Sequence, residues 1–170
     1  HPELELVSVT GRSAVGKRIG AVFPHLDTVD LPIDAEIDSE TDLVFSALPH
    51  AASAEKLVPL VDNGSRVVDF SADFRLNDRA IYKEWYEVDH PAPSHLKTAV
   101  YGLPELKRSA VREAALVANP GCYPTATILA LTPAVANSLI TEDVVVDAKS
   151  GVSGAGRGLS LNTHYAEVNE

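Results

Sequence analysis

The chain has 170 residues, of which 45% are hydrophobic, and its 24 acidic and 14 basic side chains give a formal net charge of −10. Scattered acidic residues disfavour nucleic acid and anionic membranes as partners, and no apolar run approaches the roughly 18 residues of a membrane span. The single cysteine cannot form an intramolecular disulfide, and no Cys/His grouping has metal-ligand spacing. We therefore predict a soluble cytoplasmic protein of one domain or slightly more, without a metal site.

Short aliphatic and β-branched runs bounded by turn residues predict strands, mostly buried on both faces. These runs lie at 4–9, 43–47, 66–70, 116–118 and 144–148. Helix-compatible stretches alternate with them, at about 14–23, 51–61, 77–86, 106–114 and 122–139. The alternation predicts βαβ units and a parallel sheet, which is an α/β fold.

Prolines and glycines interrupt or end the predicted helices and strands. Pro59 lies inside the second helical stretch, where its missing N–H predicts a kink or a later start, and Asn63-Gly64 predicts the end of that helix. Residues 87–98, with two prolines and no periodicity, are expected to form an exposed connection.

Polar and small residues follow each predicted strand. In open parallel sheets, ligands bind outside the carboxyl ends of the strands, so we expect these residues to meet in one cleft. The segments are 10–13, 46–50, 71–75, 119–122 and 149–157.

Cys122 is the most conspicuous of these residues, because it follows Asn119-Pro120-Gly121 and opens a long apolar helix. Free backbone N–H groups and the helix dipole favour a thiolate there. Such a thiolate can attack an acyl carbon while neighbouring N–H groups hold the developing oxyanion. The alternative is that Cys122 is a small buried hydrophobic residue.

Two further segments are typical of cofactor contacts. Thr10-Gly11-Arg12-Ser13 ends the first predicted strand, where dinucleotide folds meet the adenosine ribose. An arginine at that place accommodates the 2′-phosphate, so the segment favours NADP over NAD. The glycine-rich stretch 149–157 suits close approach of a ligand but lacks the ending of a P-loop. Exposed turns without a ligand are the alternative for both segments.

His164 lies beside the glycine-rich stretch, and an imidazole is suited to proton transfer near neutrality. A single histidine is more often structural, so a general-base role for His164 stays one of two interpretations.

The segment 119–125, Asn-Pro-Gly-Cys-Tyr-Pro-Thr, resembles the active-site signature of the N-acetyl-γ-glutamyl-phosphate reductase family of arginine biosynthesis. Ser-Ala-Asp-Phe-Arg at 71–75 is also specific to it, whereas Leu-Pro-His at 48–50 suits the related aspartate-semialdehyde dehydrogenases as well. Further matching segments follow in the same order across nearly the whole chain. All matching segments are 11–13, 47–50, 69–76, 101–105, 119–125 and 150–157.

The resemblance implies a homo-oligomeric two-domain enzyme with a doubly wound, Rossmann-like NADP-binding domain. Residues 1–118 would be the remainder of that domain without its first βα unit, and residues 119–170 the start of an α+β catalytic and dimerisation domain. Cys122 would attack the acyl phosphate, expel phosphate and form a thioester, which hydride from NADPH reduces to the semialdehyde.

The resemblance also implies site residues. Cofactor contacts would come from Gly11, Arg12, Ser13, Ser46, Pro49, Ser153 and Gly154. Substrate contacts would come from Ser71, Arg75, Asn119 and Arg157. Asp73 would help to shape the site, and an arginine fork suits a phosphate or a carboxylate.

The chain begins at His1 without a methionine and reaches strand-like residues within three positions, so we expect a piece of a longer polypeptide. The resemblance places a glycine-rich, pyrophosphate-binding turn before His1 and a catalytic histidine after Glu170. The 170 residues alone are therefore expected to be inactive.

Two alternatives to this function remain. One is an aspartate-semialdehyde or lysine-pathway reductase with the same chemistry. The other, of a different class, is a non-catalytic nucleotide-sensing module.

Overall fold

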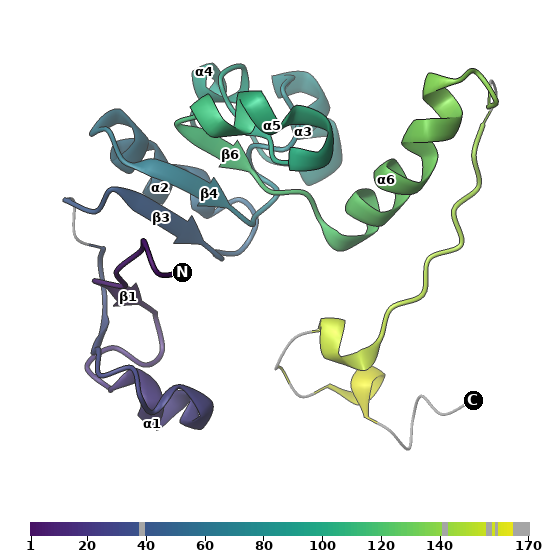
Figure 1. The fold of residues 1–170 in the computed structure, drawn as a ribbon. Coiled ribbons are helices and arrows are strands. Elements are labelled where there is room, and N and C mark those ends of the chain that lie inside the picture. Colours follow the sequence, from purple (N-terminus) through teal and green to yellow (C-terminus); the bar gives the residue numbers. More distant parts are fainter. Residues whose placement is uncertain (38–39, 141–142, 156–157, 159, 165–170) are drawn as a thin grey trace. The chain divides into compact units, whose positions relative to one another are not determined.

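The computed structural model describes residues 1–37, 40–140, 143–155, 158 and 160–164 (Figure 1). The chain divides into two compact units, His1–Gly121 and Cys122–Glu170.

The first unit opens with a two-stranded parallel sheet. Strand β1 (Val9–Thr10) pairs with β2 (Ile33–Asp34), and between them lie α1 (Ile19–Val22) and the 3-10 turn η1 (Pro24–Leu26). The predicted strand at 4–9 and helix at 14–23 are both shorter than expected. Leu4, Leu6 and Val7 are more than half exposed, and Gly16 adopts a left-handed φ of 81°, which a right-handed helix cannot contain.

A four-stranded parallel sheet forms the centre of the first unit, in the order β3-β4-β6-β5. Its strands are β3 (Leu43–Ser46), β4 (Arg66–Asp69), β5 (Val100–Tyr101) and β6 (Leu116–Ala118). The prediction of a parallel sheet is confirmed, as are the three longer strands to within one residue. The two-residue strand β5 was not predicted.

Four helices connect these strands: α2 (Ser53–Asp62), α3 (Arg79–Tyr86), α4 (Pro93–Leu96) and α5 (Pro104–Glu113). Helix α2 begins two residues later than the predicted stretch, at Ser53, and continues through Pro59. Its apolar side packs on the sheet. The core cluster consists of Val44, Ala54, Leu57, Leu60, Val67, Phe74, Leu96, Leu116 and Ala118.

The expectation of an exposed connection at 87–98 is only partly confirmed, because most of its residues are exposed but two are buried. This segment contains α4, and its Leu96 is 1% exposed and belongs to the core. His90 is also buried, with its ring edge-on to the rings of Phe74 and Tyr82. The buried side chains of His90 and Leu96 hold this segment against the core, and because they follow no repeating sequence pattern their burial was not predicted.

Burial of the strands on both faces holds for β6, whose three residues are all buried. It is wrong for β3, because the side chain of Phe45 is 59% exposed and stacks on Phe70 at a ring-centroid distance of 6.2 Å. In the described chain, the face that carries Phe45 is therefore less covered than the face that packs on α2.

The second unit contains α6 (Cys122–Ala136) and the 3-10 turns η2 (Val152–Ala155) and η3 (Leu161–Thr163). The predicted strand at 144–148 is wrong: no strand is assigned there, and Val145 is 95% exposed. A strand needs a hydrogen-bonded neighbour, and the described residues provide none for it. Within those residues, no helix combines the length and apolarity needed to cross a membrane.

Candidate active site

Three predicted strand ends meet at one edge of the central sheet. Ser46, Asp69 and Ala118, the last residues of β3, β4 and β6, are paired in register. Hydrogen bonds continue beyond the strands, from Phe70 N to Ser46 O and from Asn119 N to Asp69 O, each 2.8 Å long. Of the other two expected ends, one belongs to β1 in the separate small sheet, and 144–148 is not a strand.

Arg75 ties the end of β4 to the end of β6. Its Nε donates to the carbonyl of Asn119 at 2.8 Å, and its Nη2 donates to the carbonyl of Phe70 at 2.7 Å. The guanidinium therefore links the two strand ends, and its Nη1 has no partner among the described residues.

Ser71 is turned inward. Its hydroxyl donates to Asp69 Oδ2 at 2.6 Å and accepts the N–H of Asp73 at 3.2 Å. Ser71 and Asp69 are both buried. The Ser71 hydroxyl thus holds the loop together, and a substrate contact by Ser71 stays a prediction.

Asp73 is fully buried and its carboxylate gathers four donors. Oδ1 accepts the N–H of Ala51 at 2.7 Å and the hydroxyl of Tyr82 at 3.2 Å. Oδ2 accepts the N–H groups of Ser53 at 3.1 Å and Ala54 at 3.0 Å, at the start of α2. Burial and the adjacent Asp73 carboxylate raise the pKa of Tyr82, so this phenol stays protonated and donates.

The segment after β3 carries the expected cofactor residues Ser46 and Pro49. Pro49 is exposed, whereas the Ser46 hydroxyl is buried and has no hydrogen-bond partner among the described residues. His50 Nδ1 accepts the N–H of Ala72 at 3.0 Å. An orphaned hydroxyl at a strand end is suited to a bound polar ligand, so Ser46 fits a nicotinamide dinucleotide.

Gly11, Arg12 and Ser13 directly follow β1, as predicted. The N–H of Gly11 donates to Asp34 O at 3.0 Å, and a Cβ at Gly11 would lie only 3.0 Å from Ile33 Cγ2. Arg12 and Ser13 are exposed, so a cation and a hydroxyl are both available at this turn. These groups also fit an anionic cofactor.

Tyr101 lies at the same edge of the sheet and was expected only as part of the matching segment 101–105. It ends β5 opposite Ala118. Burial raises the pKa of Tyr101, while the nearby Arg75 lowers it, which places the phenol within electrostatic range of that guanidinium. Its position immediately before Gly102 at a strand end was the available signal.

In the second unit, Cys122 is exposed and is the first residue of the 15-residue helix α6, as expected. No acidic side chain in the first turn opposes the positive end of the helix dipole. Ser153 and Gly154 lie in η2, where Gly154 N donates to Gly151 O at 3.0 Å. His164 is exposed directly after η3, and Arg157 lies outside the described residues.

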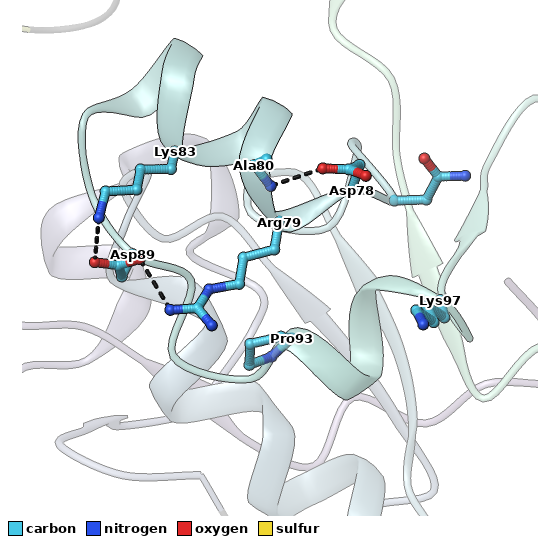
Figure 2. A pocket seen from close by; sticks show the side chains of 8 residues that line it. Asp78, Arg79, Ala80, Lys83, Asp89, Pro93 and Lys97 are labelled. Carbon is cyan, nitrogen blue, oxygen red and sulfur yellow. Dashed lines mark hydrogen bonds and ion pairs between the residues drawn. The ribbon is translucent and has the colours of Figure 1, made fainter.

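A surface pocket in the first unit contains none of the predicted site residues (Figure 2). Asp89 lies in it between Arg79 and Lys83, at 3.1 and 2.8 Å from their nitrogens. Both cations lower the pKa of Asp89. Because Asp89 pairs with Arg79 and Lys83, the charged side chains in this pocket form a surface ion-pair cluster. Elsewhere in the described chain, no three His, Cys, Asp or Glu residues form a group that could hold a metal ion.

Family models account for most of the chain. Residues 1–114 match the model described as semialdehyde dehydrogenase, NAD binding domain. The chain belongs to the semialdehyde dehydrogenase family. Residues 122–170 match the semialdehyde dehydrogenase dimerisation domain, so the match begins at Cys122. The predicted α/β fold with a nicotinamide-binding domain is thereby confirmed.

Relatives of about 50% identity align with the whole of this chain. The proteins named N-acetyl-γ-glutamyl-phosphate reductase from Dehalococcoides mccartyi, Desulforudis audaxviator and Geobacillus thermodenitrificans are 51%, 50% and 49% identical to it. Each alignment covers 100% of this chain and 50–51% of the relative. The chain therefore spans about half the length of the curated relatives that it matches.

Proposed function

We propose that this chain is part of an NADP-dependent N-acetyl-γ-glutamyl-phosphate reductase, a homo-oligomeric cytoplasmic enzyme of arginine biosynthesis. The observation that carries the proposal is the exposed thiol of Cys122 at the first residue of α6. It occurs in a chain that is about half identical, over its whole length, to relatives bearing that name. The division into a cofactor domain (1–118) and a catalytic domain (119–170) belongs to the same proposal.

In the proposed reaction, the Cys122 thiolate attacks the γ-acyl carbon and forms a C–S bond. The C–O bond to the phosphoryl group breaks, and the electron pair leaves with phosphate. Free N–H groups in the first turn of a helix can stabilise the intermediate oxyanion. The cofactor, when bound, supplies the hydride that turns the thioester into an aldehyde and frees the cysteine.

The remaining roles follow from charge and position. We propose that Gly11, Arg12 and Ser13 receive the adenosine end of NADP. Ser46 and Pro49 would line its path, and Ser153 with Gly154 would lie toward the nicotinamide. We propose that substrate anions bind Arg75, whose Nη1 has no partner among the described residues, and that Asn119, Ser71 and Arg157 are further substrate contacts.

The test uses the full-length enzyme in the phosphorolytic direction. N-acetylglutamate semialdehyde and phosphate should reduce NADP, and Cys122→Ala should abolish NADPH formation while retaining NADP binding and the wild-type circular dichroism spectrum. Turnover in the folded Cys122→Ala variant would refute the nucleophile. A higher kcat/KM for aspartate semialdehyde than for N-acetylglutamate semialdehyde would refute the substrate.

NADP preference has a separate test at Arg12. A charge-assisted hydrogen bond to the 2′-phosphate contributes about 1.5–3 kcal/mol, so Arg12→Ala should raise the KM for NADPH by roughly 10- to 100-fold. The KM for NADH should stay unchanged, because NADH lacks that phosphate. Equal effects on both cofactors would contradict the assignment.

A further inference from the structure

The N-terminus of α2 is capped by a residue that lies far from it in the sequence. The residue at its own N-cap position, Ala52, has no side chain that could accept a hydrogen bond. The donors are satisfied instead by Asp73, which lies about 20 positions further along the chain, in the loop after β4. A local Ser or Asp would satisfy the same N–H groups without joining two loops.

The segment that Asp73 holds is strained. Ala51 has a φ of 62°, a left-handed conformation that is disfavoured for residues other than glycine, by about 1 kcal/mol or more. The shortest of the Asp73 hydrogen bonds, 2.7 Å, is made to the N–H of this residue. The carboxylate therefore stabilises a conformation that the chain would not keep by itself.

Two further contacts reinforce the same link between the loops. The Ser53 hydroxyl donates to Asp69 Oδ2 at 2.8 Å, and the N–H of Ala72 donates to His50 Nδ1 at 3.0 Å. Asp69, Asp73 and Ser53 are each 0% exposed. Two buried carboxylates are costly to desolvate, and donors from both loops supply hydrogen bonds that offset this cost.

We propose that Asp73 is a positioning residue for cofactor binding. By fixing residues 50–54, it sets the path of the loop that begins at Ser46 and passes through Pro49. The inference rests on the proposed function, because it takes that loop as a cofactor contact. Asp73 itself need not touch the cofactor.

The primary variant is Asp73→Asn in the full-length enzyme. The amide keeps the shape and one acceptor oxygen but turns an N–H donor toward the donors of the loop. Loss of one or two hydrogen bonds to a charged group predicts a rise of about tenfold or more in the Kd for NADPH. Measured by NADPH fluorescence titration, that rise should accompany a kcat at saturating NADPH close to wild type and an unchanged rate of Cys122 alkylation.

Asp78→Ala is the matched control. Asp78 caps α3 through the N–H groups of Ala80 and Ile81, at 2.7 and 3.1 Å, and its side chain forms no hydrogen bond with residues 50–54. It should lower the melting temperature while leaving the Kd for NADPH unchanged. Ala51→Val covers the case in which Asp73→Asn does not fold. A β-branched side chain disfavours the left-handed φ of this residue more strongly than alanine does, so the variant should loosen the same segment and raise the Kd for NADPH.

The outcomes separate the two claims. A wild-type enzyme that binds neither NADPH nor NADH would overturn the proposed function and this inference together. This inference alone would be overturned if the wild-type enzyme binds NADPH and Asp73→Asn, although less stable, binds NADPH with the same Kd. Should Asp73→Asn not fold, an unchanged Kd in Ala51→Val would have the same result.

Discussion

At the scale of single residues, the two hydrogen bonds of Arg75 require a guanidinium rather than an ammonium group. Its two bonded nitrogens reach carbonyls from different strand ends, Phe70 after β4 and Asn119 after β6. A planar fork can meet both acceptors at once and still present a third nitrogen, whereas an ammonium is a single compact charge. Arg75 therefore combines a bracing role with the proposed anion contact.

Substituting Arg75 by lysine tests this bracing. Arg75→Lys should lower the free energy of unfolding by about 1–2 kcal/mol, because at least one half-buried carbonyl loses its partner. Urea unfolding of the full-length enzyme measures the loss. Arg66→Lys is the control, since Arg66 makes one exposed hydrogen bond, to Arg112 O, and should change stability by less than about 0.5 kcal/mol. Equal losses in the two variants would contradict a special role for Arg75.

The comparison of Cys122 with Asp73 shows how much of the site the sequence could predict. Cys122 depends on local signals, a glycine before a long apolar helix, and its position at the start of α6 is confirmed. The backbone N–H partners of the Asp73 carboxylate lie about 20 positions away, and Asn119 lies 44 positions from Arg75. Such contacts exist only after strands pair, so the sequence alone could name these residues but not their bonds.

At the scale of elements, the sequence predicted the strands that find neighbours. The apolar runs of β3, β4 and β6 pair with one another, and their positions are confirmed. The runs at 4–9 and 144–148 have similar composition but remain largely or wholly unpaired in the described chain. Strand formation depends on a partner and on burial more than on intrinsic preference. This dependence explains why equally apolar runs had different outcomes.

The residue after β5 packs so closely against β6 that position 102 requires a glycine. A Cβ on Gly102 would lie 2.6 Å from Val117 Cγ1 and 3.3 Å from Ala118 O. Gly102→Ala should therefore destabilise the protein by about 1–3 kcal/mol through overpacking. Val117→Ala removes the clashing methyl, so the double variant should lose less than the sum of the single losses. Additive losses in urea unfolding would show that the two positions do not couple.

At the scale of the whole molecule, stability should depend on pH through His90. Its Nδ1 accepts the N–H of Ala92 at 3.1 Å, and its ring is enclosed by Phe74 and Tyr82. Burial lowers the pKa of His90, although the nearby Asp73 carboxylate acts in the opposite direction. The folded protein therefore resists protonation of His90 more than the unfolded chain does. Stability from the neutral imidazole is complete above the unfolded pKa of about 6.5 and declines below it.

Acidification gives the corresponding experiment. The free energy of unfolding of the wild type should fall as the pH is lowered below about 6.5, because the unfolded state then binds the additional proton. His90→Phe keeps an aromatic ring against Phe74 and Tyr82 but cannot be protonated, so its decline should be shallower. At neutral pH it should be less stable by about 1 kcal/mol, since the N–H of Ala92 loses its acceptor. His25→Phe, at an exposed position, should follow the wild-type profile. Parallel profiles for wild type and His90→Phe would exclude His90 as a source of the pH dependence.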